Sequence, residues 1–191
     1  MEAKQIMLTS PNSVKAVTYV NYNVTDDLIG GAIREAQEIH LQSIIGTALL
    51  RRLQELVKNK IENENDNIDS EANAAYKHLL DEYVEPYLIS TAQFLLCTPL
   101  TFKVRNMGVV QNSDTNVDKV LAGDLNKVEA RFKNESLQRA TKLSKYLCKY
   151  KSAYPELESS CDCNETKPMI GRKFVNVPLN LGQHRGDCCC D

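Results

Sequence analysis

Residues 25–57 decide the fold class: TDDLIGGAIREAQEIHLQSIIGTALLRRLQELV. Thr25 is a suitable N-cap, and the two aspartates that follow it favour the first turn of a helix. Gly46 can adopt the left-handed conformation that ends a helix. We therefore predict a first helix that begins at residues 25–27 and stops at Gly46, and a second, shorter helix from Thr47. Apolar residues recur in the first helix with the spacing of one buried face: Ile29, Ala32, Ile33, Ala36, Ile39, Ile44 and Ile45.

The chain downstream of this stretch continues in a helical pattern. Residues 58–70, KNKIENENDNIDS, are polar and are interpreted as a surface loop. Ser70 then caps a long predicted helix that Pro99 ends. Because proline removes a backbone donor, Pro86 predicts a kink or break of this helix near residues 83–85.

A last long helix is predicted from about Val117 to Lys151. Near its end the apolar residues follow steps of three and four, which is typical of a narrow packing stripe. The stripe comprises Ala140, Leu143, Leu147 and Tyr150. The long helices together predict a mainly α fold, a helical bundle.

Three segments lack this helical pattern. Residues 101–111, TFKVRNMGVVQ, have two β-favouring runs around Asn106, Met107 and Gly108, and they predict a short β-hairpin whose turn uses a positive φ at Gly108. Residues 1–24 and 156–191 are interpreted as extended N- and C-terminal arms. The domain organisation is therefore an arm, a helical domain over residues 25–155 that carries the hairpin, and a second, cysteine-rich arm.

Composition favours an ordinary globular protein. The chain has 191 residues, of which 42% are hydrophobic and 25% charged, a length that suits one domain with extensions. No apolar run approaches the roughly 18 residues of a membrane span, so no membrane partner is expected. The first ten residues lack the apolar core of a secretory signal.

Charge is unevenly distributed along the chain. Residues 1–100 carry 8 basic and 14 acidic groups, a net charge of −6, whereas residues 101–155 carry 11 and 5, a net charge of +6. A subunit polarised in this way can pair head to tail with copies of itself or bind a charged partner. The alternative interpretation is a chance difference between solvated faces.

Motifs of the common enzyme classes are missing from the sequence. There is no Gly-rich nucleotide loop, no HExxH and no GxSxG, so we do not expect an enzyme. His40 and His78 are interpreted as helix-surface or partly buried residues rather than acid–base groups. The carboxylates of Asp81, Glu82 and Glu85 are interpreted as a solvated face.

Seven cysteines divide into two groups. Cys97 and Cys148 lie in apolar helical patterns and are predicted to be small buried residues. The other five lie in the C-terminal arm, where Cys161, Cys163, His184 and Cys188 are weak candidate metal ligands, followed by Cys189 and Cys190. Familiar zinc sites place about two to four residues between paired ligands, and these spacings differ, so no metal or cofactor is expected. A small zinc-dependent nucleic-acid-binding or regulatory module is the alternative function.

A basic stripe lies on the last predicted helix. It comprises Lys142, Lys145 and Lys149, with Arg139 nearby. These side chains could contact DNA phosphates without sequence specificity. The interpretation that we favour is a solvated helix face that contacts acidic neighbours.

Four stretches carry a resemblance to a known family. They are NYNVTDDLIGGAIREAQEIHLQSIIGTALLRRLQEL from Asn21, VEPYLISTAQFLL from Val84, FKVRNMGVVQNSD from Phe102 and QRATKLSKYLCKYKSAYPEL from Gln138. Over about residues 20–157, the order of elements resembles head–tail connector proteins of tailed bacteriophages, including the ring proteins of crAss-like phages that infect gut Bacteroidetes. In these proteins a helical core carries a short hairpin with a Gly-Val step, and the last helix ends in a Tyr-Pro motif.

The resemblance implies a structural protein of the virion. Such proteins assemble in the host cytoplasm into a homo-oligomeric ring, commonly of twelve copies, beneath the portal protein. The ring extends the DNA conduit, joins neighbouring tail or ring proteins, and catalyses nothing. Extended arms that bind neighbouring copies and repeated weak contacts would suit such a ring.

Overall fold

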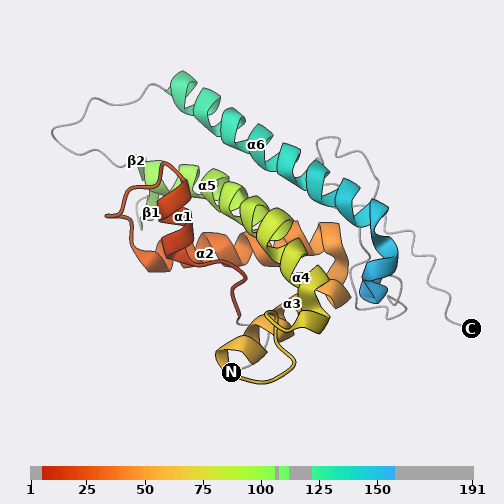
Figure 1. The fold of residues 1–191 in the computed structure, drawn as a ribbon. Helices are drawn as coiled ribbons and strands as arrows, with labels where there is room; N and C mark the ends of the chain where they lie inside the picture. The colour runs from red at the N-terminus through yellow and green to blue at the C-terminus, as the bar shows by residue number, and fades with distance from the viewer. Residues whose placement is uncertain (1–5, 106–107, 112–121, 158–191) are drawn as a thin grey trace, which may run out of the picture.

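The computed structural model describes residues 6–105, 108–111 and 122–157, and it is mainly helical, as predicted. Helix α5 (Glu85–Thr101) lies at the centre. Helix α6 (Ala122–Lys149) packs on one side of it and α2 (Asp26–Glu35) on the other (Figure 1). No helix among the described residues is long and apolar enough to cross a membrane.

Residues 6–17 differ from the extended arm that we predicted. Residues 6–10 are irregular, but Pro11–Val17 form the short helix α1, which packs against α2 and α5. The Ser10 side chain accepts a hydrogen bond from the Ser13 N–H at 3.0 Å, and Pro11 occupies the first turn. This Ser-Pro pair is a helix-start signal that we missed, since Pro is favoured at N1 and Ser at the N-cap.

The chain before α1 is anchored to the helical body. The amide of Gln37 accepts from the Leu8 N–H and donates to the Ile6 carbonyl, both at 3.0 Å. The side chains of Ile6 and Leu8 are themselves buried. The segment is therefore part of the core and not a free arm.

The first predicted helix contains a π-helical turn. After α2 the backbone widens at η2 (Ala36–Leu41), and α3 (Gln42–Ile61) follows. A π turn inserts one extra residue and shifts the phase of the buried face. As a result Ile39, which we predicted to be buried, is 62% exposed.

Gly46 bends α3 as the sequence predicted. Its φ of 80° and ψ of 165° break the helical backbone between the two predicted helices. This combination of angles is essentially restricted to glycine. The bend lies in the core, because Gly46 and its chain neighbours Ile45 and Thr47 are all buried.

The polar loop after α3 is more ordered than a surface loop needs to be. Ile68 is buried, and its N–H donates to the Leu56 carbonyl at 3.2 Å. Asn73 donates to the Asp66 carboxylate and to the Asn67 carbonyl. The prediction of a loop on the surface was right for residues 62–70, but these bonds fasten it to α3 and to the next helix.

Pro86 is accommodated by a second π turn. The 3₁₀ turn η3 (Glu71–Asn73) leads into α4 (Ala74–Leu79), η4 (Leu80–Val84) and α5. The widened turn at η4 lies where the sequence predicted a kink. It precedes Pro86, which has no backbone N–H to donate to the preceding turn. Pro99, by contrast, does not end α5, which continues to Thr101.

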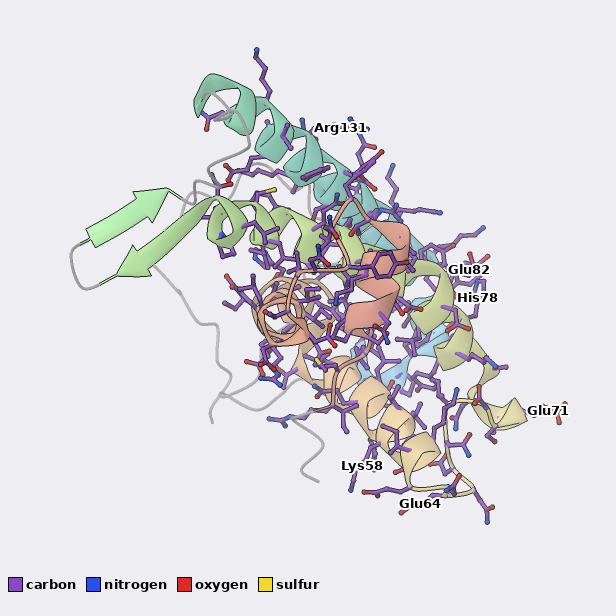
Figure 2. All side chains as sticks on the ribbon, turned by 90° about the vertical axis from the view of Figure 1, so that its left-hand side faces the viewer. Lys58, Glu64, Glu71, His78, Glu82 and Arg131 are labelled. Atoms are coloured by element: carbon purple, nitrogen blue, oxygen red, sulfur yellow. The ribbon has the colours of Figure 1, made fainter. Side chains whose placement is uncertain are left out.

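Two short strands follow α5. Strand β1 (Phe102–Arg105) pairs antiparallel with β2 (Gly108–Gln111), and Arg105 lies opposite Gly108 in the register. The pair projects from the helical body (Figure 2). Gly108 is therefore the first residue of a strand, and its assignment to the turn was wrong.

The core consists of two hydrophobic clusters. The smaller one joins α1, α2 and α5, and the larger one joins α3, α4, α5, α6 and the turns after α6, namely η5 (Lys151–Ala153) and η6 (Pro155–Leu157). Within the larger cluster, Ala140, Leu143 and Leu147 are buried as predicted, whereas Tyr150 is 43% exposed. Leu157 is buried, so the predicted C-terminal arm begins after it at the earliest, and residues 158–191 lie outside the described part.

Candidate functional site

The predicted basic stripe of α6 divides between two places. Lys142, Lys145 and Lys149 are exposed, and their spacing puts them on one face of the helix. Arg139 instead donates to the Glu135 carboxylate at 2.9 Å and lines a cleft. The lysine face, defined as Lys142, Lys145 and Lys149, is therefore a surface of its own without Arg139.

Tyrosine rings lie beneath the lysine face. The Lys142 ammonium lies 5.4 Å from the centre of the Tyr83 ring, and the Lys149 ammonium lies 5.1 Å from that of Tyr150. Both separations fall in the range of cation–π attraction. The rings hold the two ammonium groups over the helix while leaving them open to solvent.

The same rings belong to a tyrosine cluster that the sequence analysis did not find. Tyr146 on α6 stacks on Tyr83 with ring centres 4.1 Å apart, and its hydroxyl lies 3.1 Å from that of Tyr154. Tyr154 is fully buried and donates to the Ala75 carbonyl at 3.0 Å. The cluster ties α6 to α4 and η4, although its members lie up to about eighty residues apart in sequence. In the sequence, only the Tyr-Pro pair at Tyr154 marked a part of this cluster.

Two tyrosines at this cluster, Tyr76 and Tyr154, have raised pKa values. Burial, with the neighbouring Glu156 carboxylate, raises the pKa of Tyr76 to about 12. Burial, with the Tyr146 hydroxyl, raises the pKa of Tyr154 as well. Tyr76 donates to Glu156 at 2.9 Å. The bonds of Tyr76 to Glu156 and of Tyr154 to Ala75 join the turns after α6 to α4.

The other titratable residues that we singled out lie in different elements. Burial lowers the pKa of His40 in η2, and the charge of Glu35 partly opposes that shift. His78 in α4 packs edge-on against the rings of Tyr83 and Tyr146. Figure 2 shows His78 and Glu82 at the same edge of the molecule. Asp81 and Glu82 are exposed, whereas Glu85 accepts from the Thr9 hydroxyl at 3.0 Å.

Cysteines give no metal site in the described ranges. No group of three or more His, Cys, Asp or Glu side chains is placed to hold a metal ion within residues 6–101 and 126–157. Cys148 is exposed and Cys97 is half-buried, so the prediction that both are buried was wrong for Cys148. The weak candidates Cys161, Cys163, His184 and Cys188 lie outside the described residues.

A cleft of about 490 Å³ lies between α1, α5 and α6. Its apolar lining includes Val17 and Ile89, and its polar lining includes Glu85, Gln93 and the Glu135–Arg139 ion pair. Gln93 is only 7% exposed, and its Nε2 group has no hydrogen-bond partner among the described residues. The cleft is therefore lined by apolar side chains and by carboxylates, of which Glu135 is paired with Arg139.

The two outer layers of the fold carry opposite charge. The segment 26–41, α2 with η2, has four acidic groups and one basic group, a net charge of −3. Helix α6 has seven basic and three acidic groups, a net charge of +4. Because α5 lies between them, the charges face opposite sides of the molecule (Figure 1). Figure 2 shows a second separation, with Arg131 on α6 at the opposite end from Glu64 and Glu71.

A family model matches residues 41–167 of the chain, two thirds of its length, and its description is a family of unknown function, DUF6712. The chain belongs to the DUF6712 family. The part matched to DUF6712 contains the lysine face and the tyrosine cluster, whereas α1 and α2 precede it. Comparisons with curated proteins and with solved structures found no match.

Proposed function

We propose that this protein is a structural subunit of a tailed-phage virion, one that assembles into the ring of the head–tail connector. In this proposal the ring lies below the portal protein, extends the DNA conduit and joins neighbouring tail or ring proteins. The protein catalyses nothing and takes no cofactor. The order of its elements, which resembles that of connector proteins, is the reason for naming this class of assembly.

The observation that carries the proposal is the opposite charge of the two outer layers. A ring needs a heterologous interface, in which one surface of each copy binds a different surface of the next. Helix α6 and the α2–η2 segment are two such surfaces, with net charges of +4 and −3. Complementary potentials across an interface steer association and fix its register. We therefore place the lysine face of one copy against the α2–η2 segment of its neighbour.

Charge reversal tests this interface. Lys142→Glu with Lys145→Glu reverses part of α6, and Asp27→Lys with Glu38→Lys reverses part of the acidic layer; all four side chains are exposed. Each double variant alone should lose assembly, because like charges then meet at every contact. An equimolar mixture of the two variants should assemble again, since each reversed surface meets a reversed partner. The readout is the mass distribution by light scattering after gel filtration.

A matched control separates this effect from a general change of charge. Glu64→Lys with Glu71→Lys changes the net charge by the same amount as Asp27→Lys with Glu38→Lys, at exposed positions in the loop after α3 and in η3. This control should assemble like the unaltered chain. Loss of assembly by the control, or failure of the mixture to recover it, would exclude the proposed contact.

A further inference from the structure

The contact between the lysine face and the α2–η2 segment needs more than opposite charge. Ion pairs between exposed side chains contribute little free energy and are screened by salt, so complementary charge sets the register of an interface more than its affinity. Stable interfaces have an apolar centre surrounded by polar groups. Each of the two surfaces carries one exposed large apolar residue, which is Ile39 within residues 26–41 and Tyr150 within residues 142–150.

Ile39 is exposed because the backbone is widened at η2. In a regular α-helix, a residue three positions after the fully buried Ala36 would lie on the same, buried face. In the π turn it is Leu41 that is fully buried, and Ile39 is 62% exposed. Glu35, about one turn earlier, and Glu38 are both exposed beside it. The π turn, a feature that is frequent at functional sites, thus presents an aliphatic side chain within an acidic border.

Tyr150 provides the matching feature at the end of α6. Its ring packs against that of Tyr146 with ring centres 4.8 Å apart, and the Lys149 ammonium lies 5.1 Å from the centre of the Tyr150 ring. These contacts hold the ring in place while 43% of the residue stays exposed. Val128, the other exposed large apolar residue on the described part of α6, lies about four turns before Lys142, or about 20 Å along the helix axis. Tyr150 is therefore the apolar residue that adjoins the lysine face.

We infer that Ile39 of one copy packs on the ring of Tyr150 of a second copy and forms the apolar centre of their interface, an inference that rests on the proposed ring. Around this centre, the carboxylates beside Ile39 meet the lysine face of the second copy. The charges fix the register, and the removal of both apolar surfaces from water supplies most of the affinity. The partner is a second copy because each surface has the charge that complements the other.

Photo-cross-linking in the full-length protein locates this contact. A benzoylphenylalanine replaces Ile39, or Ile61 as a control, because Ile61 is 63% exposed but lies at the end of α3. Copies labelled with ¹⁴N and ¹⁵N are mixed before assembly and irradiation. Mass spectrometry should then find mixed-isotope links from position 39 to residues 146–150, and none to those residues from position 61. Links confined to one copy, links to other segments only, or no link would overturn the inference.

Substitutions at both positions test whether the two side chains share one contact. Ile39→Ser and Tyr150→Ser should each raise the protein concentration at half-assembly about tenfold or more, because each removes apolar surface from the centre. In the Tyr150→Ser background, Ile39→Ser should add less than about a twofold change, since its partner is already missing. Additive effects of the two substitutions would contradict the pair.

Matched controls exclude a general effect of losing an exposed apolar side chain. Val128→Ser, at a residue 44% exposed, and Ile61→Ser should each change the half-assembly concentration less than about twofold. Equal losses from these controls would overturn the inference. The cross-link from position 39 leaves Tyr150 unaltered, so it decides the question even where Tyr150→Ser destabilises the fold.

The charge-reversed variants keep this inference apart from the proposed function. If they assemble only when mixed, but Ile39→Ser assembles like the unaltered chain, the apolar centre alone is overturned. Copies that stay monomeric at every protein concentration would contradict the ring, and this contact with it.

Discussion

Gly46 is the residue on which the bend within α3 most depends. Its φ of 80° and ψ of 165° are strained for any residue with a Cβ. Gly46→Ala should therefore lower the free energy of unfolding by about 1–3 kcal/mol, measured by urea denaturation. Gly31→Ala is the control, since Gly31 lies within α2 and a Cβ there meets no atom within 4 Å. That variant should be neutral or slightly stabilising. Equal losses would show that the backbone angles at Gly46 are not the cause.

Asp69 makes the stability depend on acid pH. Hydrogen bonds from Lys60 and Lys77, each at 2.8 Å, lower the pKa of Asp69 from 3.8 to about 2. Because the pKa is lower in the folded state, the two ion pairs stabilise the fold above about pH 4, and that contribution is lost as the pH falls toward 2.

The variant Asp69→Asn should therefore flatten the melting temperature profile between pH 4 and pH 2. Glu64→Gln, an exposed neighbour in the same loop, should leave the profile unchanged. If Asp69→Asn and the unaltered chain gave parallel profiles, the lysines would not be responsible.

At the scale of elements, the cap of α1 determines whether that helix forms. The Ser10 hydroxyl accepts from the Ser13 N–H at 3.0 Å, whereas Thr25, the N-cap of α2, makes no such bond. Ser10→Ala should cost about 1 kcal/mol of stability and Thr25→Ala less than about half of that. Chemical denaturation measures both losses. A larger loss for Thr25→Ala would contradict the capping geometry.

Sequence patterns predicted the long helices better than their irregular parts. The period of three and four residues placed α2, α3 and α6 because each buries one face, and Gly46 marked the break that lies within α3. Helix α5 was predicted as well, although its residues 87–93 are all buried. The π turns were not predictable, because one extra residue leaves no clear mark in the periodicity of the sequence. Its effect is visible only in the structure, where Ile39 is exposed. Helix α1 was missed because its burial depends on Val14, a single fully buried side chain that packs on α2 and α5.

The candidate surfaces were predictable only in part. The lysine face follows from spacing along one helix, which is local information. The tyrosine cluster and the cleft each combine residues from three or more elements, so they exist only once the tertiary fold brings those elements together. Arg139 shows most plainly the limit of predicting a surface from residue spacing alone. Its spacing assigned it to the lysines, but Glu135, one turn earlier, directs its guanidinium elsewhere.

At the scale of the whole molecule, three layers separate charge in a way that allows copies to bind in series. A basic α6, a central α5 and an acidic α2 with η2 give each copy two different and complementary surfaces. Such a contact repeats from copy to copy, and it closes into a ring if the rotation between neighbours closes. The antiparallel strands β1 and β2 project from this body and leave both outer layers uncovered in the described part of the chain (Figure 2).

Native mass spectrometry of the full-length chain tests the central claim most directly, which is that copies of this protein assemble with one another into a closed ring. The account predicts one discrete multiple of the subunit mass, unchanged by a chelator and unaffected by further increases in protein concentration. A monomer at every protein concentration, or an open series of masses that never closes, would contradict it.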